Sequence, residues 1–329
     1  MRTHRDADHV CLLMSDALVP AADADSGNPV KLRGMAPDAG SHRVWWTSRI
    51  RAVAVLLALF PNHANAQGCP YSTTCPEPSR PERMSREASY AIDVGANVLI
   101  GGLTGGVAQR WNGGSFWRGF TRGAAGGGLV FAGKQVAAAR FTGAGVAGRQ
   151  LAAVGSSVVN NAAAGRPALS RFVVPLGPVR VYAEPAAGRA HAKLDLAGVA
   201  AIAWGATRPG ARLDLSSTLS SGAPVFRVSP DWGHRAAHLA GVVLVNELEG
   251  QFPKALAHER VHVAQYDFAS VTWGEPAESW IASEVPPLRG LYRYVDFGSA
   301  VVLLSGLNMV VPDQDKPWEN EAHLLAGTR

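Results

Sequence analysis

Two histidines and a glutamate form the most chemically specific pattern in this sequence. His258 and His262 lie four positions apart, and Glu259 directly follows the first of them. Residues four apart on an α-helix share one face, so both imidazoles can point at one metal ion. Zinc accepts imidazole nitrogen as a ligand, and an adjacent carboxylate can take a proton from a metal-bound water. The pattern predicts a zinc site in which His258 and His262 bind the metal and Glu259 activates the water.

The residues before this pattern predict a strand and then a helix. The run 241–246 is short and β-branched, which is typical of a strand, and Pro253 suits the first turn of a helix. The alternative is a buried helix whose histidines only hydrogen-bond to their neighbours. A strand followed by a helix with His-Glu-x-x-His resembles the arrangement of the zincin metallopeptidases.

The resemblance to zincins implies a third protein ligand and an open fourth position on the metal. In metzincins a glycine and a histidine stand three and six residues after the second histidine, where this chain has Gln265 and Phe268. In gluzincins the third ligand is a glutamate on a later helix. The candidates in this chain are Glu275, Glu278, Glu284, Glu319 and Glu321.

Glu319 is the preferred third ligand. Pro317 can open a helix, which places Glu319 in its first turn. The pattern Glu-x-Glu-Ala from 319 is similar to the third-ligand helix of the gluzincin subfamily that includes the membrane-bound CAAX-processing proteases, and this resemblance implies Glu319 as the ligand. Glu321 is the alternative ligand, and a first-turn glutamate favoured only by the helix dipole is the alternative for both.

The chain departs from that subfamily four residues after Glu319. The subfamily usually has an aspartate there, and this chain has His323. A histidine at this position could hydrogen-bond the ligands or stabilise a charged intermediate, so we expect His323 beside the site. The resemblance covers only the span from His258 to His323.

An export signal is predicted upstream. Arginines precede the apolar run 52–60, and Ala-Asn-Ala at 64–66 provides a cleavage site. The run is too short to cross a bilayer. We interpret 1–66 as a leader with a signal peptide, for which Met35 is the more natural start. The mature protein is then expected in the periplasm, the cell envelope or the extracellular space.

The segment 67–88 is rich in proline, serine and charge, which predicts a linker. It contains Cys69 and Cys75, and a cysteine pair at this spacing in an exported chain favours a local disulfide. Two free thiols are the alternative. Because Cys69 follows the signal so closely, a lipoprotein is a further alternative.

The segment 89–165 is rich in glycine and alanine, and its glycines recur at four-residue spacing. Small residues four apart let helices approach closely, which predicts a helical hairpin. Aromatic residues near Trp111 and Phe116 mark its turn. One interpretation is a hairpin in or against a membrane, and the other is tight packing in a soluble domain, because polar residues interrupt every long apolar stretch.

The segment 166–329 is predicted to hold a β-sheet and a zincin-like metal-binding core. Period-2 alternation is typical of half-buried antiparallel strands, so we expect an antiparallel sheet under the metal-binding helix. His191, His234 and His238 fall in this region, and nothing in their spacing distinguishes one of them. The alternating runs are 171–174, 179–182, 192–196, 211–215 and 225–228.

These patterns together predict an α+β protein with a Gly-rich helical hairpin, an antiparallel sheet and a C-terminal zincin-like helical core. The net charge of +5 comes from scattered basic residues, which does not support a nucleic-acid partner. The predicted function is that of an exported zinc metallopeptidase acting on a peptide or protein, in active or degenerate form. The alternative is a non-catalytic cell-envelope structural or binding protein with a membrane-associated hairpin.

Overall fold

The computed structural model describes residues 85–232, 236–246, 252–304 and 317–328. All of them belong to the unit Asn62–Arg329. The predicted leader 1–66, its signal peptide and the start at Met35 lie outside the described residues, as do Cys69 and Cys75.

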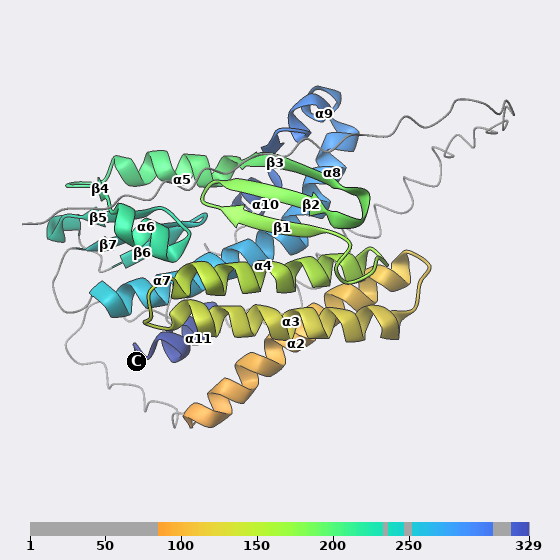
Figure 1. Cartoon of the computed structure of the whole chain (residues 1–329), viewed down its shortest axis with the longest axis horizontal. Helices are drawn as coiled ribbons and strands as arrows, with labels where there is room; N and C mark the ends of the chain where they lie inside the picture. Colours follow the sequence, from red (N-terminus) through yellow and green to blue (C-terminus); the bar gives the residue numbers. More distant parts are fainter. Residues whose placement is uncertain (1–84, 233–235, 247–251, 305–316, 329) are drawn as a thin grey trace, which may run out of the picture. The chain divides into compact units, whose positions relative to one another are not determined.

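Three long helices, rather than two, form the Gly- and Ala-rich segment. Serines cap the first two: the Ser85 hydroxyl accepts a hydrogen bond from the N–H of Ala88, and Ser115 accepts one from Arg118. The predicted hairpin is therefore the first part of a three-helix bundle (Figure 1). Its helices are α2 (Arg86–Trp111), α3 (Phe116–Ala138) and α4 (Ala144–Ala163).

Glycines let these helices touch backbone to backbone. A Cβ on Gly127 of α3 would collide with the carbonyl oxygen of Asn97 on α2, and one on Gly123 would collide with that of Gly101. This close packing accounts for the four-residue glycine spacing within the bundle. Among the described residues, α2 is long and apolar enough to cross a membrane, and 28% of its apolar window is buried.

The strands form two small mixed sheets, which corrects the prediction of an antiparallel sheet. The first has the order β1-β2-β3-β8, and β8 pairs with β3 in parallel. The second has the order β4-β5-β7-β6, and β5 and β7 are parallel. The strands are β1 (Phe172–Leu176), β2 (Val179–Glu184), β3 (Arg189–Asp195), β4 (Arg212–Leu213), β5 (Val225–Val228), β6 (Ala236–Leu239), β7 (Val242–Asn246) and β8 (Val295–Asp296).

The physical reason for the difference lies in β7. The two-residue turn at Ala240 and Gly241, both with positive φ, folds β7 back on β6 and places it beside β5. All five residues of β7 are buried, so it lacks the alternation that reveals half-buried strands. The helix α5 (Leu196–Ala206), which follows β3, covers one face of this sheet.

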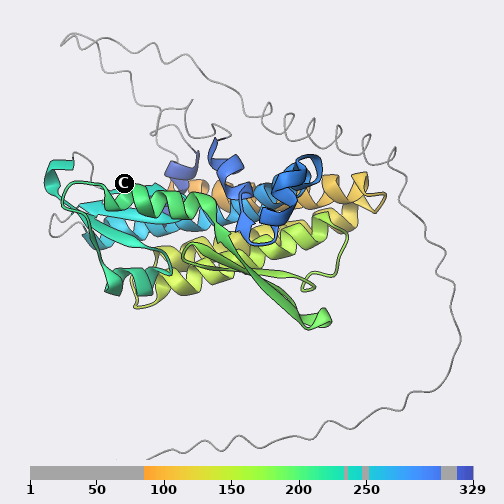
Figure 2. The ribbon, with the colours of Figure 1, turned by 90° about the horizontal axis from the view of Figure 1, so that it is seen from above.

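Helix α7 (Phe252–Ala269) carries the His-Glu-x-x-His pattern and packs between the bundle and the second sheet. Leu256 and Val263 pack on Val243 and Val245 of β7. On its other side α7 contacts α3 and α4 and runs alongside α4 (Figure 1 and Figure 2). The remaining helical elements are η1 (Pro185–Ala187), α6 (Leu215–Ser221), η2 (Pro230–Trp232), the π-helical turn η3 (Ser270–Gly274), α8 (Glu275–Glu284), α9 (Pro286–Tyr292), α10 (Gly298–Leu304) and α11 (Pro317–Ala326).

A buried ion cluster ties α7 to the first sheet. Arg180 lies 2.8 Å from a carboxylate oxygen of Asp195 and 2.9 Å from one of Asp296. The hydroxyl of Tyr266, on α7, donates to Asp195 at 3.0 Å, and that of Ser299 donates at 2.6 Å. A hydrogen bond to a charged group contributes about 1.5–3 kcal/mol, so the bond from Tyr266 to Asp195 helps to hold the C-terminal half of α7 in place.

Glu278 of α8 lies fully buried beside this cluster. Lys193 is 3.2 Å from its carboxylate, and the N–H of Phe297 donates to it at 3.3 Å. Burial and the neighbouring Asp296 raise the pKa of Glu278 to about 8, against the opposing effect of Lys193. A carboxyl with a raised pKa stabilises the folded state while it is protonated, so its contribution is lost as the pH rises through that pKa.

We expect the Gly127→Ala variant to unfold more easily than the natural protein. The added methyl group must push Asn97 and α2 away, and such overpacking costs about 1–3 kcal/mol. Gly95→Ala on α2 is the matched control, since nothing lies within 4 Å of its new Cβ. It should gain roughly 0.5–1 kcal/mol from helix propensity. Urea unfolding followed by circular dichroism measures both, and equal stabilities would contradict this packing.

We expect Glu278→Gln to reduce the pH dependence of stability. The natural protein should lose unfolding free energy as the pH rises from about 4.5 to about 8, because the folded state keeps a proton that the unfolded state releases. A glutamine is neutral throughout and removes this contribution. Urea unfolding at the two pH values measures the difference, and Glu284→Gln, an exposed site on the same helix, should leave it unchanged.

Candidate metal centre

Helix α7 places two imidazoles one turn apart on the same face. The Nε2 atoms of His258 and His262 are 3.0 Å apart, and both residues are buried. The spacing of four residues predicts this arrangement, because successive turns of a helix stack side chains four positions apart. Two nitrogen donors therefore converge on one point beside α7.

Helix α11 brings a carboxylate to the same point. Oε2 of Glu319 is 3.2 Å from Nε2 of His258, and Oε1 is 3.3 Å from Nε2 of His262. One ligand atom from each of the three residues lies within 4.8 Å of the others. Ligands about 2.0–2.1 Å from a tetrahedral zinc ion are roughly 3.3 Å from one another, which is close to the distance from each imidazole nitrogen to its own oxygen of Glu319.

The Glu319 carboxylate and the His262 imidazole shift each other's pKa. Partial burial raises the pKa of Glu319, but its hydrogen bonds with His258 and His262 hold that pKa well below its ordinary value. Burial lowers the pKa of His262, and the bond to Glu319 and the nearby Glu259 carboxylate raise it overall. A metal ion at this point would supply positive charge beside the Glu319 carboxylate.

Glu259 is buried beside the two imidazoles. Burial raises its pKa, and the neighbouring His262 and His258 oppose that rise. Among the described residues, the structure gives its carboxylate no hydrogen-bond partner. A general base works best when its pKa is moved towards the working pH, and this environment moves the pKa of Glu259 in that direction.

The other four candidate glutamates lie elsewhere. Glu275 pairs with Arg171, Glu278 pairs with Lys193, and Glu284 is exposed. The carboxylate of Glu321, the alternative third ligand, is 2.7 Å from the ammonium group of Lys134. Only Glu319, of the five, belongs to the cluster with the histidines.

His323 lies beside the cluster, as the sequence predicts. Its ring centroid is 4.4 Å from that of His258, and its Nδ1 is 2.7 Å from the hydroxyl of Thr328. The same hydroxyl is 3.5 Å from Nδ1 of His258, at the outer limit of a hydrogen bond. His323 therefore contacts the ring of His258, and Thr328 lies near Nδ1 of that ring, while Nε2 faces His262.

His238 is a site residue that the sequence does not distinguish. It lies on β6 with its ring 6.0 Å from that of His262. The N–H of Gly241 donates to its Nε2 at 3.0 Å, and burial lowers its pKa to about 3, so the ring is neutral. His191 instead stacks on Tyr182, and His234 lies outside the described residues. The pairing of β6 with β7 brings His238 next to His262, and no sequence pattern predicts this placement.

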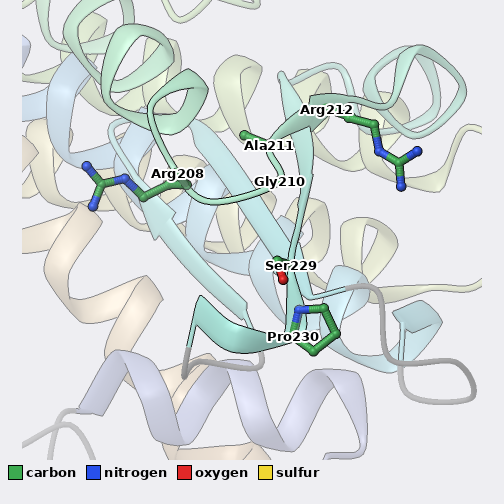
Figure 3. Close-up of a pocket in the computed structure, with 6 residues that line it drawn as sticks. All are labelled: Arg208, Gly210, Ala211, Arg212, Ser229 and Pro230. Atoms are coloured by element: carbon green, nitrogen blue, oxygen red, sulfur yellow. The ribbon is translucent and has the colours of Figure 1, made fainter.

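A surface hollow of about 570 Å³ lies away from this centre, at the end of the second sheet. The side chains of its two arginines, Arg208 and Arg212, extend to opposite sides (Figure 3), so they do not converge on a ligand. None of the metal-centre residues lines it. The hollow is formed by Arg208, Gly210, Ala211, Arg212, Ser229 and Pro230.

The chain matches no family model, no curated protein and no solved structure.

Proposed function

We propose that this chain is an exported zinc-dependent hydrolase of peptide bonds with a zincin-like core. His258, His262 and Glu319 hold the metal, and Glu259 is the general base. The observation that carries the proposal is that α7 and α11 bring one donor atom each from His258, His262 and Glu319 within 4.8 Å of one another. The donor set of two imidazoles and one carboxylate is one that catalytic zinc sites use.

The proposed chemistry divides between the metal and Glu259. A bound zinc ion would supply a Lewis acid that lowers the pKa of a water molecule. Glu259, buried next to both imidazoles, takes the proton of the attacking water and passes it to the nitrogen of the leaving amine. The neutral His238 does not add a second positive charge beside the metal ligands.

The second sheet supports a peptide as the substrate. Among the described strands, β6 pairs only with β7, which leaves its other edge without a strand partner. His238 connects β6 to the site, because its ring lies against that of His262. An extended peptide can add to such an edge through main-chain hydrogen bonds. The edge therefore offers a way to lay a peptide beside the metal.

A second candidate function is a cell-envelope structural or binding protein whose bundle associates with a membrane. The length and apolar composition of α2 favour it, and Ile92 and Leu99 are exposed apolar residues of that helix. Export itself, with a signal peptide and a disulfide between Cys69 and Cys75, is proposed from the sequence alone. Zinc content separates the two functions, because the second does not require a metal.

We expect the purified protein to bind one zinc ion through Glu319. After removal of metal with a chelator, zinc at 100 times its dissociation constant should stabilise the natural protein by about 2.7 kcal/mol. Glu319→Ala should lose this stabilisation, and Glu284→Ala, at an exposed site, should keep it. Calorimetry of zinc binding and thermal unfolding measure both effects. Equal zinc affinity in the Glu319→Ala and natural proteins would exclude Glu319 as a ligand.

We expect Glu259→Gln to separate metal binding from catalysis. The variant keeps all three donors, so its zinc content should equal that of the natural protein. Loss of the general base should slow hydrolysis by about 10²–10⁴-fold. Mass spectrometry of a library of unstructured peptides detects the new termini that hydrolysis produces. A zinc-loaded Glu259→Gln protein with full activity would refute the assigned role.

A further inference from the structure

One metal-binding histidine has a polar partner on the side opposite the metal. Nδ1 of His262 is 2.7 Å from Oε1 of Gln265, which lies three residues later on α7. Within the described part of the chain, Nδ1 of His258 has only the hydroxyl of Thr328, at 3.5 Å. The two ligands therefore differ in how firmly their rings are held.

The orientation of the Gln265 amide follows from its other partners. Its Nε2 lies 3.1 Å from the backbone oxygen of Trp318 and 2.7 Å from a carboxylate oxygen of Glu321. Both of these oxygens only accept hydrogen bonds, so the amide NH₂ must face α11. The amide oxygen must then face His262 and accept a hydrogen bond from its Nδ1–H. This assigns a proton to Nδ1 of His262, so in the metal-bound state, where the ring is neutral, the Nε2 lone pair is the one that faces the metal.

Glu321 is held in turn by the helical bundle. Lys134 of α3 and Asn97 of α2 each donate to its carboxylate at 2.7 Å, and Lys134 also donates to the amide oxygen of Asn97 at 2.8 Å. All three side chains are almost completely buried. The charge of Lys134 balances that of Glu321, which makes a buried carboxylate tolerable at this position. The orientation of Gln265 is therefore determined by residues of α2, α3 and α11.

We propose that Lys134, Glu321 and Gln265 form a chain of positioning residues that holds His262 in its metal-binding tautomer. This inference rests on the proposed function, because it assigns a role around the same zinc ion. Glu321 acts through Gln265 and does not bind the metal itself. The Gly-rich bundle then supports the metal centre. Asn97 and Lys134 contact Glu321, which contacts Gln265, and Gln265 contacts His262.

The variant Gln265→Met tests the chain because it keeps the side-chain volume and removes both the amide oxygen and the NH₂ group. Loss of such a supporting hydrogen bond lowers metal affinity by about 10- to 100-fold. Gln150→Met is the matched control, because Gln150 also makes a partly buried hydrogen bond, to the backbone oxygen of Pro175, but on α4 and away from the metal. Its zinc affinity should equal that of the natural protein in competition with a chromogenic chelator.

A rescue variant separates positioning from a general structural effect. Exchange of the two residues, Gln265→Glu with Glu321→Gln, restores an acceptor for His262 and a donor from α11 while it keeps the net charge. The double variant keeps an acceptor for Nδ1 of His262, so it should bind zinc more tightly than Gln265→Met. Equal zinc affinities of the double variant and Gln265→Met would overturn the chain as proposed.

A spectroscopic measurement on the natural protein does not depend on any variant. An NMR spectrum that correlates the imidazole ring protons with the ring nitrogens of the zinc-loaded protein should show His262 protonated at Nδ1 and bound to the metal through Nε2. Binding through Nδ1 would overturn the inference, as would equal zinc affinities of Gln265→Met and Gln150→Met. A natural protein that binds no zinc would instead refute the proposed function itself, so the two failures are distinguishable.

Discussion

The structure depends on the burial of a helix that is rich in polar groups. Helix α7 is buried for most of its length, although it carries histidine, glutamate, arginine, tyrosine and aspartate side chains. Buried polar groups are costly unless they find partners, and a buried charge needs a partner even more. The elements around α7 supply those partners. Arg149 of α4 pairs with Asp267, and serines of α6 accept hydrogen bonds from Arg260.

These partners also fix the rotation of α7 about its own axis. The bonds of Tyr266 to Asp195 and of Asp267 to Arg149 are made in the same rotation that turns His258 and His262 towards α11. A rotation of α7 would break several buried hydrogen bonds at once. The proposed metal ligands are thus oriented by the contacts of other residues of the same helix, and sites built on rigid elements are more precise than sites on loops.

The Gly-rich bundle contributes to the same positioning. Because glycines allow α2 and α3 to touch, Asn97 and Lys134 lie close enough to donate hydrogen bonds to the same carboxylate, that of Glu321 on α11. Glu321 is in the helix that carries Glu319, so the bundle fixes the helix that completes the donor set. From the sequence alone, the glycine pattern is consistent with either membrane association or tight helix packing. In the structure it brings Asn97 and Lys134 into contact with Glu321, next to the site.

The sequence by itself determined what depends on near neighbours along the chain. The four-residue spacing of His258 and His262, the helix opened by Pro317 and the alternating strands of the first sheet were all predictable, because each follows from local geometry. Only the tertiary structure decided which of five glutamates reaches the imidazoles, that Glu321 instead pairs with Lys134, and that His238 and Gln265 stand beside the ligands. It also decided the parallel pairing of β5 with β7. The physical reason is that such contacts join distant segments, whose distances are set by packing around α7 rather than by any local spacing.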